Sequence, residues 1–403
     1  MTPAVDSEIA PQPQSRRLGQ VTGFDGIRGV GVLIVFVSHM FVLIPLPTFI
    51  VIPGGTVSLD MFFVLSGFLI TVLLLKEQQR AGKIGVGAFY RRRVLRLVPA
   101  MVAVLAAMSI FAWLTHTWTS QYPSSILSVG FYYSNYYAAA SPNAYCGNLA
   151  PGFGHLWSLS FEEQFYFLWP WITIALLTIR MRLRTVVVIL LFLITVVAVR
   201  RGLSYHGVQS WCSVFHRTDM RADAILWGAL IAHLWVRRKE PTRGLTAAAW
   251  IAAVCLLAIL PFGGITGPFL YRGGLVVIDI ACAVLVLAVI DGTWKGRWLF
   301  ELKPFVALGV VSYGFYLWHF PVFFGVRHFD AHWPYVIRIA VATALTVALT
   351  LLSWVLIERP MIQWKDRLEA KRHASPVRDE AIAEPEVTAH YGVLEREPDP
   401  ADD

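Results

Sequence analysis

Long apolar runs, separated by short polar segments, recur along almost the whole chain of 403 residues. A helix needs about 20 mainly apolar residues to cross the roughly 30 Å hydrocarbon core of a bilayer, and several runs are near the short limit. The runs predict about ten membrane-spanning helices, at residues 28–45, 57–75, 97–115, 157–178, 185–200, 219–236, 245–260, 273–290, 305–325 and 335–357. The pattern therefore indicates an all-α polytopic membrane protein rather than several soluble domains.

Positive charge is distributed unevenly among the segments between these spans. With the N-terminus placed in the cytoplasm, 27 of the 34 Lys and Arg residues fall in inside segments and 7 in outside segments. Such a bias in short loops supports an even number of spans with both termini in the cytoplasm. Because the basic residues lie beside spans, the net charge of +8 indicates topology, and we expect no nucleic-acid partner.

Polar segments flank the apolar region at both ends. Residues 1–20 are polar and contain Pro, which predicts a short cytoplasmic tail without a cleavable signal peptide. We assign residues 21–364 to a single transmembrane domain, whose lack of a fixed-period repeat weakly disfavours transporter folds built from inverted repeats. From residue 365 the chain is charged and contains Pro, so residues 365–403 are predicted to form a disordered, solvated cytoplasmic tail.

Two of the four cysteines fall in predicted outside loops. Cys146 lies in segment 116–154 and Cys212 in segment 200–218, where an oxidising exterior would permit a bridge between them. A bridge and two free thiols are equally open alternatives. Cys255 and Cys282 lie in spans, where we expect packing residues.

The first span carries two ionisable residues in the stretch RGVGVLIVFVSH, which begins at Arg28 and ends at His39. Eleven helical steps bring the two side chains to within about 20° of the same face, about 16 Å apart along the axis. Arg28 at the inner surface would place His39 in the outer half of the bilayer. Ionisable residues inside spans are costly and mark functional sites by default.

Further ionisable residues lie toward the outer ends of other spans: Asp60, Glu162, Glu163, Asp223 and His319. A histidine, two glutamates and an aspartate from different helices could meet His39 in one polar chamber, where a carboxylate would tune it as a general base. Structural roles are the alternatives. His39 could be a packing residue whose hydrogen bonds are satisfied, and the two glutamates could cap the outer end of their helix. His319 could be an interfacial residue, and Asp223 could pair with Arg221. No metal-binding spacing such as HExxH is present, so we expect no metal.

Two arginines, Arg93 and Arg96, lie at the inner mouth of the third span in FYRRRVLRLVPA. Their i,i+3 spacing places them on one helix face, where paired guanidinium groups could hold the phosphates of a cytoplasmic ligand. The alternative is that they are ordinary cytoplasmic anchors of the span.

Seven motifs, in order, resemble the acyltransferase-3 family of integral-membrane acyltransferases: FDGIRGVGVLIVFVSH, SLDMFFVLSGFLIT, RRRVLRLVPA, LWSLSFEEQFYFLWP, RADAILWG, SYGFYLWHFPV and IERP. The resemblance covers about residues 20–365. It implies transfer of an acyl group, with acetyl as the default, from cytoplasmic acyl-CoA to a hydroxyl of a glycan, a glycolipid or a macrolide. Arg28 and His39 match the family's Arg/Lys-x10-His signature, and Arg93 and Arg96 match its Arg-x-x-Arg motif.

The resemblance also implies roles and partners. Acyl-CoA is a donor substrate rather than a bound cofactor, with Arg93, Arg96 and Arg28 at its phosphates. His39 would be the general base or the acyl carrier. Glu163, which is favoured over Glu162, would orient the acceptor or tune His39. We expect a bacterial inner membrane location and a stand-alone membrane domain, so that any SGNH hydrolase-like partner would be a separate protein. A transporter or flippase of an envelope precursor is the competing interpretation.

Overall fold

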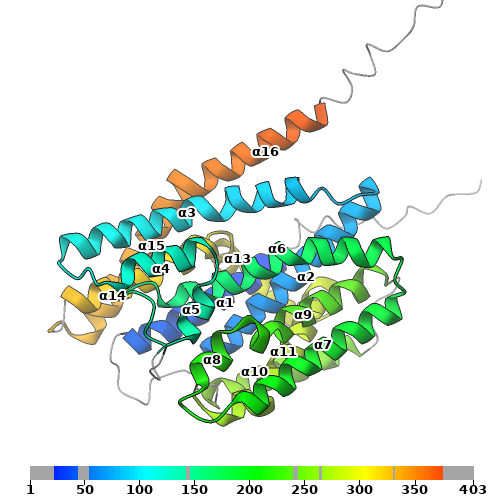
Figure 1. The fold of residues 1–403 in the computed structure, drawn as a ribbon, viewed down its shortest axis with the longest axis horizontal. Helices are drawn as coiled ribbons and strands as arrows, with labels where there is room; N and C mark the ends of the chain where they lie inside the picture. Colours follow the sequence, from blue (N-terminus) through cyan, green and yellow to red (C-terminus); the bar gives the residue numbers. More distant parts are fainter. Residues whose placement is uncertain are drawn as a thin grey trace, which may run out of the picture.

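The computed structural model describes residues 22–43, 54–141, 146–238, 244–262, 266–329 and 332–374. Within these ranges all regular secondary structure is helical (Figure 1). The N-terminal tail predicted for residues 1–20 lies outside the described residues.

Each of the ten predicted spans coincides with a helix or a bent helix pair. These are α1 (Thr22–Leu43), α2 (Gly55–Ala81), α3 (Val86–Leu114), α6 (Trp157–Thr178), α7 (Leu183–Ser204), α9 (Thr218–Val236), α10 (Leu245–Ile259), α11 (Leu275–Asp291), the pair α13 (Lys303–Val310) and α14 (Ser312–Phe329), and α15 (Tyr335–Ser353). Shorter elements connect them: α4 (Gln121–Gly130), α5 (Ser134–Ala139), η3 (Gly154–Leu156), α8 (Trp211–His216), η4 (Leu260–Phe262), η5 (Leu270–Gly274), η6 (Lys295–Arg297), α12 (Trp298–Glu301), η7 (Trp354–Glu358) and α16 (Arg359–Ala374).

The chain is an all-α, multi-pass membrane protein. Among the described residues, six helices are long and apolar enough to cross a membrane, or seven if α13 and α14, bent by 77°, form one span. Helices α6 and α9 are not among the six although they have 22 and 19 residues, and both carry acidic residues: α6 contains the FEEQ stretch and α9 begins TDMRAD. The number of ten spans and the cytoplasmic position of both termini stay predictions.

Helix α2 lies at the centre of the bundle, where it packs closely against α9. The contact depends on two glycines, since a Cβ on Gly67 would lie 2.0 Å from the Ile225 carbonyl oxygen and a Cβ on Gly228 would lie 2.0 Å from that of Val64. Helix α1 packs on α13 in the same way, because Gly29 and Gly309 each face the backbone of the other helix. Small residues of this kind let membrane helices approach closely.

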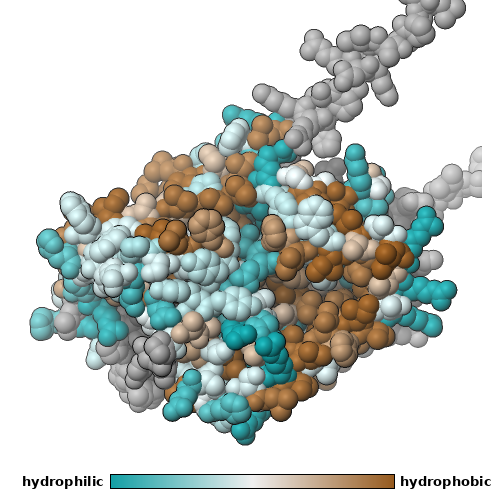
Figure 2. All heavy atoms as spheres, viewed as in Figure 1, coloured by the Kyte–Doolittle hydropathy of each residue, from teal (hydrophilic) through white to brown (hydrophobic). Residues whose placement is uncertain are grey.

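Apolar side chains cover the outside of the bundle. In Figure 2 they gather over α3, α6 and α7, while the region of the short helices α4 and α5 is paler and more hydrophilic. Helix α7 shows the pattern clearly, since Phe192 and Leu203 are 65% and 72% exposed. A surface with this much exposed apolar area fits a lipid environment.

The outer connecting segments form a compact layer on the bundle. The structure joins Cys146 to Cys212 in a disulfide, with the two Cα atoms 5.5 Å apart, which links the segment before η3 to α8. The Asn135 amide of α5 donates hydrogen bonds to the His216 carbonyl and to the Thr218 hydroxyl. These contacts place α5, α8 and α9 relative to one another.

The expected disorder from residue 365 is wrong for its first ten residues. Helix α16 continues from η7 to Ala374 and runs beside α3 before it leaves the bundle (Figure 1). The stretch KDRLEAKRHA consists mostly of strong helix formers and contains no Gly or Pro, so a helix that enters it has no reason to end there. Residues 375–403 lie outside the described residues.

Candidate functional site

Three histidines from three elements meet at one end of the candidate site. His39 of α1 and His319 of α14 share a hydrogen bond of 2.8 Å between Nδ1 of His39 and Nε2 of His319, and the two rings lie nearly in one plane with their centres 5.1 Å apart. His155 of η3 lies edge-on to His319, with the ring centres 5.2 Å apart. His319 and His155 are buried, whereas His39 keeps accessible surface. Within the described ranges, no group of three His, Cys, Asp or Glu side chains is arranged to hold a metal ion.

Tyr316 connects this histidine cluster to α6. Its carbonyl oxygen lies 2.5 Å from Nδ1 of His319, and its hydroxyl donates to the His155 carbonyl at 2.6 Å. The hydroxyl of Ser158, in the first turn of α6, lies 2.6 Å from the same Tyr316 hydroxyl. One residue of α14 therefore orients His319 through its backbone and fixes the beginning of α6 through its side chain.

Two adjacent glutamates follow one turn further along α6. Glu162 accepts hydrogen bonds from the Ser66 hydroxyl at 2.8 Å and the Tyr166 hydroxyl at 3.4 Å. Glu163 lies within electrostatic range of Arg93 and of Tyr132, a residue of the segment between α4 and α5. Burial, together with the Glu163 carboxylate, raises the pKa of Tyr132, so that its hydroxyl stays protonated.

Basic residues form the other end of the candidate site. The Arg93 guanidinium lies 3.5 Å from the centre of the Tyr166 ring, and Arg96 follows one turn later on the same face of α3. Arg28 pairs with Asp25 in its own helix at 3.2 Å and lies within electrostatic range of Arg96. Within the described part of the chain, neither Arg93 nor Arg96 forms a salt bridge, and Arg96 is exposed.

The two ends are joined by one polar track. Ser158 touches the histidine cluster through Tyr316, and Glu162 lies one helical turn, or about 6 Å, further along α6. On α1, Arg28 and His39 span the same interval, about 16 Å along the axis. Helices α1, α3, α6 and α14 thus supply a track that leads from cations able to hold phosphate to a histidine able to act as a base.

Comparison with known proteins agrees with these motifs and this geometry. The sequence profile described as an acyltransferase domain matches residues 21–358, which include every residue of the polar track. The chain belongs to the acyltransferase-3 family.

Curated relatives in this family are about twice as long as the part that they share with the chain. The chain is 28% identical over 352 residues to the peptidoglycan O-acetyltransferase OatA of Listeria monocytogenes, which covers 85% of this chain and 56% of the relative. It is 31% identical over 361 residues to the putative peptidoglycan O-acetyltransferase YrhL of Bacillus subtilis, covering 85% and 55%. It is 27% identical over 355 residues to the O-acetyltransferase OatA of Staphylococcus aureus, covering 84% and 57%. No solved structure matches the chain.

The acyltransferase-3 signature histidine has a different partner from the one expected. The sequence favoured a carboxylate, with Glu163 first, next to His39. The structure places His319 there, while Glu162 and Glu163 lie with Arg93. The reason is depth, because these glutamates lie a full turn inside α6 from Ser158, the residue level with the histidine cluster.

Asp60 and Asp223 do not belong to the chamber that was expected around His39. Asp60 forms an ion pair with Arg221, and Asp223 pairs with Arg201 at 2.6 Å rather than with Arg221. Asp279 of α11 completes this buried ion cluster, whose five side chains are at most 1% exposed. The cluster ties α2, α7, α9 and α11 together.

Several residues of these sites were not predicted from the sequence. Arg201 was assigned to an outside loop because the fifth span was ended at residue 200, but α7 continues to Ser204. Asp279 is a lone acid in the apolar stretch LVVIDIACAV, which could have marked it as an intramembrane charge. His155 begins the motif HLWSLSFEEQFYFLWP directly before α6, and its place in this motif could have marked it as a candidate site residue.

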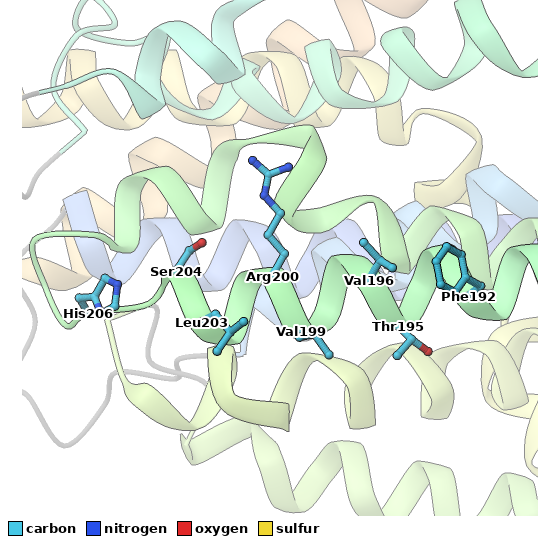
Figure 3. A pocket seen from close by; sticks show the side chains of 8 residues that line it. All are labelled: Phe192, Thr195, Val196, Val199, Arg200, Leu203, Ser204 and His206. Atoms are coloured by element: carbon cyan, nitrogen blue, oxygen red, sulfur yellow. The ribbon is translucent and has the colours of Figure 1, made fainter.

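A separate cavity of about 480 Å³ follows the exposed side of α7 near its outer end (Figure 3). Four of the eight lining residues are polar: Thr195, Arg200, Ser204 and His206. Arg200 points away from Val199 and Leu203, and its guanidinium pairs with Asp219 at 2.8 Å. None of the residues of the polar track line this cavity, so it is not part of the candidate site.

Proposed function

We propose that the chain is a membrane O-acyltransferase that moves an acyl group, by default acetyl, from acyl-CoA to a hydroxyl of a carbohydrate or glycolipid acceptor. The family and the names of the relatives support acetyl transfer. The observation that carries the proposal is the polar track, which ends at an oriented histidine on one side and, on the other, at Arg93 and Arg96, which form no salt bridge among the described residues.

The donor would bind with its phosphates at the basic end of the track. Arg93 and Arg96 share a helix face, and guanidinium groups form paired hydrogen bonds to phosphate oxygens. Arg28 adds a third cation at the same level. The long, thin pantetheine arm would then follow the track and carry the thioester toward His39.

His39 would act as the general base at the other end. In direct transfer, the acceptor hydroxyl gives its proton to His39 while its oxygen bonds to the acyl carbon. The carbon–sulfur bond breaks, and the protonated histidine returns the proton to the CoA thiolate. In the alternative route, the same nitrogen bonds to the acyl carbon first, and the carbon–sulfur bond breaks to give CoA thiolate. The acceptor hydroxyl then displaces the imidazole from the acyl carbon, and its proton goes to the thiolate.

The acceptor class follows from the relatives and not from a described pocket. Two of the relatives are named as peptidoglycan O-acetyltransferases, so peptidoglycan fragments are the first acceptors to test. The chain spans little more than half the length of these relatives. A separate SGNH-like partner and a bacterial inner-membrane location are part of the same proposal.

The test is release of free CoA from acetyl-CoA by the purified protein in lipid nanodiscs, with a panel of peptidoglycan, glycolipid and macrolide acceptors. The proposal predicts acceptor-stimulated release that is lost in His39→Ala while the protein remains folded and binds acetyl-CoA. Retained release in His39→Ala would remove His39 from the chemistry. Movement of an acceptor across the bilayer without any CoA release would favour a transporter.

A further inference from the structure

We propose that His319 is a positioning residue that fixes the tautomer of His39 and presents Nε2 of His39 as the working nitrogen. The inference deepens the proposed function and rests on it. Neutral histidine has two tautomers, and the hydrogen bond made by one ring nitrogen decides whether the other can act as a base.

The order of hydrogen bonds determines where each proton lies. A backbone carbonyl can only accept, so the contact of 2.5 Å to the Tyr316 oxygen requires the proton of His319 to be on Nδ1. Nε2 of neutral His319 then carries a lone pair and accepts from Nδ1 of His39 at 2.8 Å. Nδ1 of His39 is therefore protonated, which leaves the lone pair of His39 on Nε2.

Packing holds His319 in the orientation that this arrangement needs. Its side chain is fully buried, and its ring contacts Phe36, at 6.4 Å between ring centres, and Phe323, at 5.8 Å. The His39 ring is nearly parallel to it, with an angle of 13° between the planes. His39 alone of the pair keeps accessible surface, so its open side is the one that a substrate can reach.

The groups that face the pair carry no negative charge. His155 approaches from η3 and Tyr316 from α14, and Phe320 packs on His39 and His155. Among the described residues, no carboxylate forms a hydrogen bond with either ring. The arrangement thus differs from a carboxylate–histidine pair, because its last member is a neutral backbone carbonyl that cannot take a proton.

The same nitrogen serves either reaction route. As Nε2 of His39 takes the hydroxyl proton or the acyl group, positive charge develops on the ring. The Nδ1–H of His39 then becomes a charge-assisted donor to His319, which strengthens that hydrogen bond. His319 keeps its own proton throughout. In direct transfer the proton taken by His39 passes to the CoA thiolate, and in the acyl-imidazole route the hydroxyl proton goes to that thiolate.

The experiment compares His319→Gln with His319→Leu, measuring kcat for acetyl transfer and Kd for acetyl-CoA. The amide oxygen of Gln can accept from Nδ1 of His39, whereas Leu of similar size cannot. We expect the Leu variant to lose about 100-fold in kcat, the range of general base catalysis, and the Gln variant to keep most of it. The Kd should stay within about threefold in both, because the change is in the chemical step.

A second variant tests the tautomer without relying on the fold of the Leu protein. Nδ1-methylhistidine placed at position 39 in a His319→Ala background holds the lone pair on Nε2 by covalent structure, and the alanine makes room for the methyl group. We expect this protein to recover much of the activity that His319→Ala loses. A folded, acetyl-CoA-binding protein that remains inactive would overturn the tautomer assignment.

The outcomes separate this inference from the proposed function. If wild type releases no CoA in response to any acceptor, the proposed function itself is wrong, and if His39→Ala retains turnover, the catalytic role of His39 is wrong. If His39→Ala abolishes turnover but His319→Leu is equal to wild type, only the role of His319 is wrong. An equal loss of kcat in the His319→Gln and His319→Leu variants would also contradict the role of His319, because a side chain that accepts the hydrogen bond from His39 would then work no better than one that cannot.

Discussion

Replacing Asp223 by asparagine should destabilise the protein far more than the same change at Asp279. Asp223 contacts the Arg201 guanidinium at 2.6 and 2.7 Å, and both side chains are 1% exposed. Removing one partner of such a buried pair leaves an uncompensated charge, which costs about 3–5 kcal/mol. We therefore expect Asp223→Asn to lower the free energy of unfolding by that amount.

Asp279→Asn provides the matched comparison. The buried ion cluster contains three aspartates and two arginines, and Oδ1 of Asp279 has no hydrogen-bond partner. Its replacement by asparagine leaves both ion pairs intact, so the change should cost less than about 1 kcal/mol. The double change Arg201→Met with Asp223→Leu should recover much of the loss caused by Asp223→Asn, because a buried pair can be replaced by apolar side chains.

The assay is equilibrium unfolding in mixed micelles with increasing SDS, followed by tryptophan fluorescence, for which the chain has 15 Trp residues. The free energies of the three variants are compared with wild type under the same conditions. The reasoning would be refuted if Asp279→Asn cost as much as Asp223→Asn, or if Asp223→Asn cost less than about 1 kcal/mol.

Three further predictions concern donor binding, the outer layer and the core. Arg93→Ala combined with Arg96→Ala should raise the Kd for acetyl-CoA at least about 10-fold in a binding titration, since a hydrogen bond to a charged group contributes about 1.5–3 kcal/mol. Replacing Cys146 and Cys212 by serine should cost about 2–5 kcal/mol in the same unfolding assay, because the bridge closes a long segment. Gly228→Leu should abolish the yield of monodisperse protein, since its Cβ would lie 2.0 Å from a backbone oxygen of α2.

Each of these predictions has a control. Arg80→Ala, at the exposed end of α2, should leave the acetyl-CoA affinity unchanged. If the affinity is also unchanged in the double arginine variant, Arg93 and Arg96 do not bind the donor and are ordinary cytoplasmic anchors of the helix. Gly87→Ala should be tolerated, because nothing lies within 4 Å of its Cβ. Serine variants as stable as the bridged protein would show that hydrogen bonds of the outer layer, such as those of Asn135, suffice.

The sequence predicts the helices and part of the site because these depend on local pattern. Apolar runs predicted the helices, and the shared depth of His39 and His319 in the outer halves of their spans placed both in one predicted chamber, although their direct contact was not predicted. The i,i+3 spacing of Arg93 and Arg96 likewise gave their common face. These features follow from the period of a single helix and from the direction in which it crosses the bilayer.

The partners of the remaining charges depend on how the helices are rotated and packed, which one sequence does not define. Each residue turns a helix by about 100°, so Asp60 and His39 could be at similar depths and still face different neighbours. Asp60 faces α9 because the close contact at Gly67 and Gly228 fixes the rotation of α2. Arg201 was not predicted as a buried charge because a basic residue at the end of an apolar run is typical of a loop residue that anchors the span at the membrane surface.

The measurement that tests the central claim most directly is a paired one on wild type and His39→Ala in the same nanodiscs. It determines the Kd for acetyl-CoA by calorimetry and the rate of acceptor-stimulated CoA release. The account predicts equal affinities, with release in wild type and none in His39→Ala. Equal release in both proteins, or binding of acetyl-CoA by neither, would contradict the assignment of the polar track as an acyl-transfer site.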